Sequence, residues 1–173
     1  MKKIKTSDKK YPLKVVLNNG VKITIPKQSN FKNNFLHKHG CSIMAEYVAL
    51  QFVGIHKWPI KLYKWHKKHT KSQIKSKVTL KGIKKGISSL GKKKCSAVYY
   101  EKVTSDRISN AIKNGCCVIM EQKNPIHSIA LLPDKKGIYK VSYGTVKKVT
   151  AKGIAKTATT NSTYRGMIVI RRR

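Results

Sequence analysis

Hydrophobic positions in the first third of the chain follow two different periods. Residues 11–26 form two apolar runs around Asn18-Asn19-Gly20, and Asn-Gly between such runs is a strong signal for a β-hairpin. From residue 42 to 52 apolar side chains recur every three or four positions, and Gly54 stands where a helix would end. The pattern predicts a hairpin, a polar stretch over 27–39, and then an amphipathic helix.

Three more helices and a short strand are predicted between Gly54 and Gly115. Pro59 suits the first turn of one helix. Residues 80–90 show a second helical face, and Thr104 or Ser105 can cap a third helix. The β-branched and aromatic run at 95–100 predicts a strand between those last two helices.

After Gly115 the hydrophobic period changes to two, which is typical of strands. The expected strands are 116–121 (CCVIME), 127–132 (HSIALL), 137–143 (GIYKVSY), a weaker 145–149, and 166–172 (GMIVIRR). Helices followed by a run of antiparallel strands predict an α+β fold. We expect one domain over 11–173, preceded by a flexible basic tail at 1–10.

Length and composition are those of a folded protein. The chain has 173 residues, of which 40% are hydrophobic, enough for a sizeable core. No apolar run approaches the roughly 18 residues that a transmembrane helix needs. The basic start has no apolar segment behind it, so it does not read as a signal peptide. The location is left open between cytoplasmic and, if a signal peptide was removed, secreted.

The charge is extreme, with 39 basic residues against six acidic ones and a formal net charge of +33. Such a surface attracts polyanions, among them nucleic acid, acidic peptides and anionic cell wall. The basic residues are nearly all lysines and are spread along the chain, which favours a generally cationic surface over a base-reading face. Whether the charge serves one specific partner stays open.

The four cysteines are Cys41, Cys95, Cys116 and Cys117, and no two of them form a CxxC pair. We interpret them as reduced thiols rather than a zinc site. Histidines cluster near Cys41, but the loop lacks a second ligand pair at metal-binding spacing. We therefore expect no metal and no other cofactor.

Cys41 follows a glycine and stands at the predicted start of a helix. A helix N-terminus lowers the pKa of a thiol, and a nearby histidine can act as its base. The plainer interpretation is a small buried core residue, because free cysteines are usually buried. His127, which opens a predicted strand downstream, provides the histidine that the reactive interpretation requires.

The stretch HGCSIMAEYVALQFVG resembles the helix signature of the bacteriocin-processing, double-glycine-leader branch of the papain-like cysteine peptidases. The later segments NGCCVI, HSIALL and GIYKV resemble that family's strands, the second of which is led by histidine. The resemblance covers about 33–149. It implies N-terminal helices packed on an antiparallel sheet and cleavage of a peptide amide bond, here by a domain that stands alone.

The resemblance also assigns roles to individual residues. Cys41 takes the position of the nucleophile and His127 that of the general base. The oxyanion-hole glutamine of the family falls near Asn33, with Asn34 beside it, and asparagine is a shorter amide donor. The third catalytic position, an Asp or Asn in the family, corresponds best to Ser142, which stabilises an imidazolium less well than a carboxylate does.

Two functional hypotheses follow. The first is a cysteine peptidase that uses a Cys41–His127 dyad and an acyl-enzyme on a peptide or protein substrate. The alternative is a catalytically weak or inactive domain of the same fold that binds nucleic acid or another polyanion. Trp58 and Trp65 lie among lysines and could stack on bases, although a helix that buries its aromatic face is the simpler interpretation.

Overall fold

The computed structural model describes residues 12–135, 137–150, 152–154 and 163–173. The predicted tail at 1–10 lies outside the described residues, so the domain limits stay a prediction. The helices are η2 (Gln28–Asn30), α1 (Asn34–His39), α2 (Cys41–Phe52), α3 (Pro59–His69), η3 (Lys71–Gln73), α4 (Leu80–Leu90) and α5 (Ser105–Lys113). The strands are β1 (Leu13–Val16), β2 (Lys22–Ile25), β3 (Cys95–Tyr100), β4 (Cys117–Gln122), β5 (His127–Asp134), β6 (Gly137–Ser142), β7 (Thr145–Val149) and β8 (Tyr164–Arg172).

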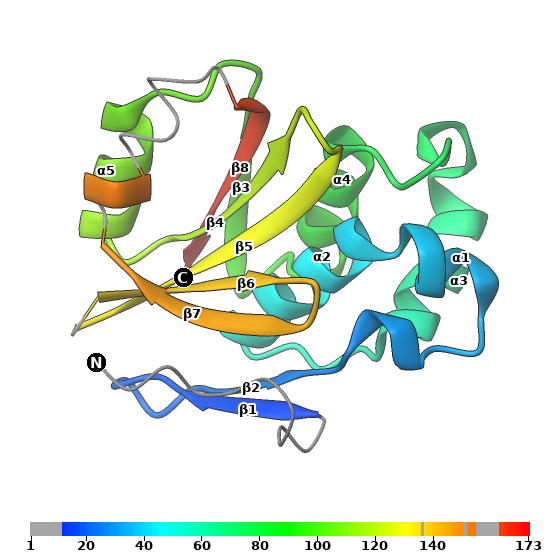
Figure 1. The fold of residues 1–173 in the computed structure, drawn as a ribbon, viewed down its shortest axis with the longest axis horizontal. Helices are drawn as coiled ribbons and strands as arrows, with labels where there is room; N and C mark the ends of the chain where they lie inside the picture. The colour runs from blue at the N-terminus through cyan, green and yellow to red at the C-terminus, as the bar shows by residue number, and fades with distance from the viewer. Residues whose placement is uncertain (1–11, 136, 151, 155–162) are drawn as a thin grey trace.

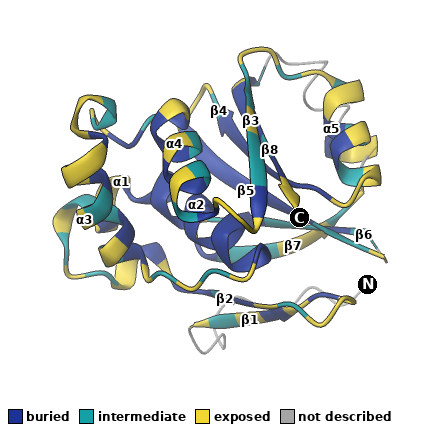
Figure 2. Ribbon diagram, turned by 180° about the vertical axis from the view of Figure 1, so that it is seen from behind, coloured by how far each residue is buried: buried dark blue, intermediate teal, exposed yellow. Residues whose placement is uncertain are grey.

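A six-stranded sheet organises the fold, with strand order β3-β8-β4-β5-β6-β7 and every neighbouring pair antiparallel. Helices α1 to α4 lie on one side of the view and α5 on the other (Figure 1). The middle strands β4 and β5 are buried, whereas α3 and α5 turn exposed residues outward (Figure 2). The combination of helices with an antiparallel sheet confirms the predicted α+β fold class.

The sheet separates two hydrophobic clusters. One cluster joins α2 and α4 to one face, where Cys117, Ile119 and Ala130 point. The other joins α5 to the opposite face through residues such as Met120 and Leu131. Successive strand residues thus contribute to opposite clusters, which is why the period-two pattern identified these strands.

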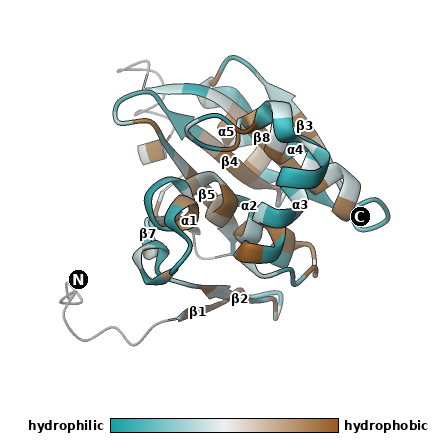
Figure 3. Ribbon diagram, turned by 90° about the vertical axis from the view of Figure 1, so that its right-hand side faces the viewer, coloured by the Kyte–Doolittle hydropathy of each residue, from teal (hydrophilic) through white to brown (hydrophobic). Residues whose placement is uncertain are grey.

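The hairpin and the helical segments appear where the sequence predicted them, with one correction. The helix at Cys41–Phe52 is not amphipathic, because all twelve of its residues are buried. Hydrophobic stretches of α2, β4 and β5 gather in the middle of the domain (Figure 3). A helix surrounded on all sides has no solvent face, so its polar residues need partners inside the protein.

Gln51 is one of these polar residues, and its partner is the hairpin. Its Oε1 accepts the Thr24 N–H at 2.9 Å, and its Nε2 donates to the Thr24 carbonyl at 2.9 Å. The amide side chain therefore mimics the edge of another strand. This double hydrogen bond attaches β2 to the central helix.

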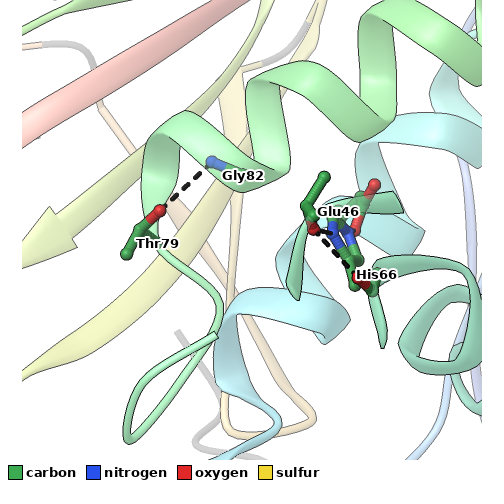
Figure 4. A network of polar contacts seen from close by, with 5 residues as sticks. Glu46, His66, Thr79 and Gly82 are labelled. Atoms are coloured by element: carbon green, nitrogen blue, oxygen red, sulfur yellow. Dashed lines mark hydrogen bonds and ion pairs between the residues drawn. The ribbon is translucent and has the colours of Figure 1, made fainter. Parts of the chain in front are cut away.

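Glu46 is the second buried polar residue of α2, and it forms a buried hydrogen-bonded pair with His66 of α3 (Figure 4). The distance from Glu46 Oε2 to His66 Nε2 is 2.6 Å, and His66 Nδ1 lies 2.7 Å from Thr70 Oγ1. Burial raises the pKa of Glu46, against the opposing effect of His66. Gly86 of α4 completes the enclosure, because a Cβ atom there would stand 2.2 Å from Glu46 Oε1. The cluster joins α2, α3 and α4.

The polar stretch at 27–39 is more structured than the sequence suggested, since it contains η2 and α1. Helix α1 ends and α2 begins at one residue, Gly40. A Cβ atom on Gly40 would lie 2.3 Å from the carbonyl oxygen of Leu36, so only glycine permits this close junction. The glycine before Cys41 is therefore the junction between two helices.

Candidate active site

Cys41 is the first residue of α2, and 8% of its surface is exposed. The first turn of a helix has backbone N–H groups without intrahelical partners, and the helix dipole favours negative charge there. A thiolate on Cys41 would lie in that field. The junction at Gly40 fixes where the sulfur points, because the backbone on both sides is helical.

His127 opens β5, and two residues of the β6–β7 turn hold its ring. Its Nε2 lies 2.9 Å from Ser142 Oγ. The ring of Tyr143 stacks on the imidazole, with 3.4 Å between ring centroids and 7° between ring planes. The hydrogen bond restrains the ring in its plane and the stacking restrains it from above. Because Ser142 engages Nε2, Nδ1 is the ring nitrogen that remains for another group.

Cys41 and Ser142 line one small space, which we call the Cys41 hollow. Its volume is about 10 Å³, roughly the space of one water molecule. It is lined by Ile25, Pro26, Cys41, Met44, Ala45, Val48, Ser128, Val141, Ser142, Tyr143 and Gly144. His127 contacts this lining through Ser142 and Tyr143. Cys41 and Ser142 thus share one hollow, and His127 is hydrogen-bonded to a residue of its wall.

A buried ion pair adds charge beside this hollow. Lys77 donates to Glu121, which also accepts from Arg165. Burial, together with Arg165, lowers the pKa of Lys77 to about 8, while Cys41 acts in the opposite direction. Lys77 is thus electrostatically coupled to the cysteine, and a cation near a thiol favours its thiolate form.

Lys77 also acts on the histidine. Burial, reinforced by Lys140 and Lys77, lowers the pKa of His127 to about 4. At neutral pH the imidazole is therefore uncharged and able to accept a proton. That is the state required of a general base.

The lowered pKa of His127 predicts a pH-dependent stability. An unfolded histidine takes up a proton near pH 6.5, whereas His127 in the folded protein does so only near pH 4. The unfolded state therefore binds more protons between these values, and the folded state loses stability as pH falls through them. We expect His127 to cost about 3 kcal/mol of unfolding free energy by pH 4.

Urea unfolding of the parent and of His127→Gln at several pH values measures this contribution. The difference in unfolding free energy between the two proteins should change between pH 6.5 and 4 and stay constant above pH 7. His56→Gln, at an exposed histidine, is the matched control and should follow the parent. Parallel curves for parent and His127→Gln would show that His127 titrates normally.

The predicted oxyanion residues have other surroundings. Asn33 caps α1, because its Oδ1 accepts the Leu36 N–H at 3.0 Å, and Asn34 is the first residue of that helix. Neither residue is part of the lining of the Cys41 hollow. Their role at an oxyanion stays a prediction.

Gln28 is an amide that the sequence reasoning overlooked. It is buried, its Nε2 donates to the His37 carbonyl at 3.1 Å, and its Oε1 has no partner within the described part of the chain. Gln28 lies next to Gly144, which lines the hollow: a Cβ atom on Gly144 would come within 3.6 Å of the backbone nitrogen of Gln28. Its position in a polar loop gave no periodic signal that could have identified it.

Several other expectations from the sequence can be compared with the structure. All four cysteines are free thiols and buried. Asp134 accepts the Asn18 N–H at 2.8 Å, which fits the structural role that its turn suggested. Within the described residues no group of three or more His, Cys, Asp or Glu side chains could hold a metal ion. No described helix has the length and hydrophobicity to cross a membrane.

Comparison with known proteins finds a likeness among solved structures. No protein-family model matches the chain, and no curated protein matches it. Among solved structures, it is similar to one from Bacillus anthracis described as a "putative C39-like peptidase", with a TM-score of 0.55 and 12% identity. The match covers 92% of this chain and 98% of that one. At this identity the likeness shows a shared fold.

Proposed function

We propose that this protein is a cysteine peptidase of the papain-like class, in which Cys41 is the nucleophile and His127 the general base. The observation that carries the proposal is the hydrogen bond between His127 and Ser142 at the wall of the hollow that Cys41 lines. A cysteine at a helix start and a histidine held by a polar partner have complementary roles in acyl transfer. The likeness to a C39-like peptidase structure supports the same class.

The proposed reaction is the hydrolysis of a peptide amide. His127 removes the proton from Cys41, and the sulfur attacks the carbonyl carbon. The imidazolium then protonates the leaving amine as the C–N bond breaks, which leaves an acyl-enzyme. Water, deprotonated by His127, attacks the thioester and releases the acid and the thiol. The backbone N–H of Cys41 is suited to stabilise the oxyanion, with a side-chain amide from Asn33, Asn34 or Gln28 as second donor.

Ser142 sets the expected efficiency. It can hold the imidazole in place, but it brings no negative charge to balance an imidazolium. The cations Lys77 and Lys140 also disfavour that imidazolium. We therefore expect a slow enzyme. We propose that its function is most similar to that of the bacteriocin-processing branch. Its substrates would then be peptides.

Selective alkylation tests the nucleophile. Iodoacetamide near neutral pH should label Cys41 at least about tenfold faster than the other thiols, because Cys41 begins a helix and His127 is its proposed base. Burial raises the pKa of Cys95 and of Cys117, which slows their reaction. Mass spectrometry of the labelled peptides gives the four rates.

His127→Ala is the informative variant for this experiment. If His127 assists ionisation of Cys41, the variant should label Cys41 more slowly and leave the other three rates unchanged. Equal rates for all four cysteines in the parent would assign Cys41 to the inert core instead.

The alternative function is a domain of this fold that binds nucleic acid or another polyanion without catalysis. The net charge of +33 and the exposure of Trp58, at 41%, favour it. Trp58 also packs edge-on against Tyr47, with 5.5 Å between ring centroids, so part of its surface serves the core. We place this alternative second.

A further inference from the structure

The sheet ends at β3, and this edge is open within the described residues. Strand β3 pairs with β8 on one side and has no described strand on its other side. Figure 2 shows β3 mostly at intermediate burial, in contrast to the buried β4. An open edge presents unpaired backbone groups that can pair with another chain.

The hydrogen bonds at the start of β3 show which groups these are. The Arg173 N–H donates to the Lys94 carbonyl, whereas the Cys95 N–H turns back to the Gly91 carbonyl. Antiparallel pairs alternate between hydrogen-bonded and non-hydrogen-bonded, so Lys94 begins the set that bonds toward β8. Ala97 and Tyr99 belong to the other set. Their N–H and C=O groups point away from β8, and no described residue pairs with them.

This edge lacks the usual protection against strand addition. Its sequence, CSAVYY, contains no charged residue and no proline, and its register with β8 is continuous. Val98 is 48% exposed in its centre. The opposite edge of the sheet, β7, carries exposed Lys147 and Lys148. Charged side chains on edge strands discourage pairing with another chain. The β7 edge has this protection and the β3 edge does not.

A hollow lies on each face of this edge, and Val98 lines both. The α5-side hollow has a volume of about 370 Å³ and the α4-side hollow about 470 Å³. The α5-side hollow is lined by Ser96, Val98, Tyr100, Arg107, Asn110, Ala111, Asn114, Cys116, Val169 and Arg171. The α4-side hollow is lined by Lys81, Lys84, Ala97, Val98 and Tyr99. Side chains of an added strand alternate between faces and would enter the two hollows in turn.

The charges around both hollows are suited to acidic side chains. Arg107 and Arg171 flank the first, and Lys81 and Lys84 flank the second. Glu101 is the acidic residue nearby, and its ion pair with Lys81 is long, at 3.8 Å, and exposed. A second copy of the chain would bring another net charge of +33 to this edge and be repelled. The occupant must therefore be of opposite charge.

We propose that the β3 edge binds an extended acidic segment of a partner protein by strand addition. The backbone of Ala97 and Tyr99 would pair with that segment, and its carboxylates would lie near the cations of the two hollows. This inference does not depend on the chemistry at Cys41.

Fluorescence anisotropy tests the proposal with a labelled nine-residue peptide in which pairs of glutamates alternate with pairs of valines, so that an added strand carries carboxylates on both faces. The salt concentration is about 0.15 M, which suppresses unspecific attraction. The parent should bind this peptide. Ala97→Pro should weaken binding about tenfold, because it removes an outward N–H while sparing the hydrogen bonds to β8. The same peptide N-methylated at alternate residues should also bind about tenfold more weakly, although its charge is unchanged.

Charge variants separate this site from general attraction. Lys81→Gln with Lys84→Gln should weaken binding several-fold, whereas Lys61→Gln with Lys64→Gln, on the exposed side of α3, should not. Unchanged affinity for the N-methylated peptide would overturn the proposal, and so would equal losses in the two lysine pairs. Dimers that disappear in Ala97→Pro would assign the edge to a second copy, and tighter binding of oligonucleotide at the same edge would assign it to nucleic acid.

Discussion

Replacing Cys41 with alanine should abolish thiol-dependent peptide cleavage, a loss of at least about 10³-fold in kcat/KM. The reason is that Cys41 is the described thiol that lines the hollow, whereas the hydroxyl of Ser142 is engaged with the histidine. Cleavage can be followed by mass spectrometry on a mixed peptide library. Cys41→Ser should lose nearly as much activity, because an alcohol lacks the low pKa of a thiol.

Cys116→Ala is the matched control for this experiment. Cys116 is a buried free thiol in the cluster on the far face of the sheet, so its loss removes a cysteine without touching the Cys41 hollow. Cleavage by this variant should stay within about twofold of the parent. If Cys41→Ala matched the parent in every assay while nucleic-acid binding stayed tight at about 0.2 M salt, the polyanion-binding alternative would replace the peptidase.

Glu46→Ala should lower the free energy of unfolding by about 3 to 5 kcal/mol. The substitution leaves His66 buried with Thr70 as its remaining described side-chain hydrogen-bond partner and opens a space between α2, α3 and α4. For a chain of this length the expected decrease in Tm is on the order of 10 °C. Urea unfolding gives the free energy and calorimetry gives the Tm.

Glu101→Ala provides the comparison, because the Glu101–Lys81 ion pair is exposed on both sides. Exposed pairs contribute little, so this variant should lie within about 0.5 kcal/mol of the parent. Glu46→Gln should fall between the two, since the amide keeps one hydrogen bond to His66. Equal stability of Glu46→Ala and Glu101→Ala would mean that the buried pair contributes nothing beyond packing.

Local signals explain how much of the fold the sequence revealed. Helix α4 and strand β3 were predicted at their observed limits, because a cap and a glycine bracket the helix and β-branched or aromatic residues mark the strand. Helix α1 was missed because its six residues, NFLHKH, are too short to show a period. The full burial of α2 was also missed, since no pattern within one helix reports what packs on its other side.

Pairings between distant residues account for most of what was missed near the candidate site. Glu46 and His66 are 20 positions apart, and Lys77 and Glu121 are 44 apart. Neither pair can be predicted from the local hydrophobic pattern, because the partners come together only in the folded chain. Cys41, His127 and Ser142 could be named beforehand through resemblance to a family, whereas Gln28 and Tyr143 match no quoted motif.

The position of Tyr143 has a consequence for how a substrate would enter. Its backbone adopts a φ of 50°, an uncommon conformation for a bulky residue, and its ring covers His127. With only about 10 Å³ beside Cys41, a peptide finds no room until this ring moves away. Affinity would then be scaled by the fraction of molecules whose ring is displaced. Glycine at position 143 would relieve the backbone and raise that fraction, so tighter substrate binding could be obtained by removing a contact.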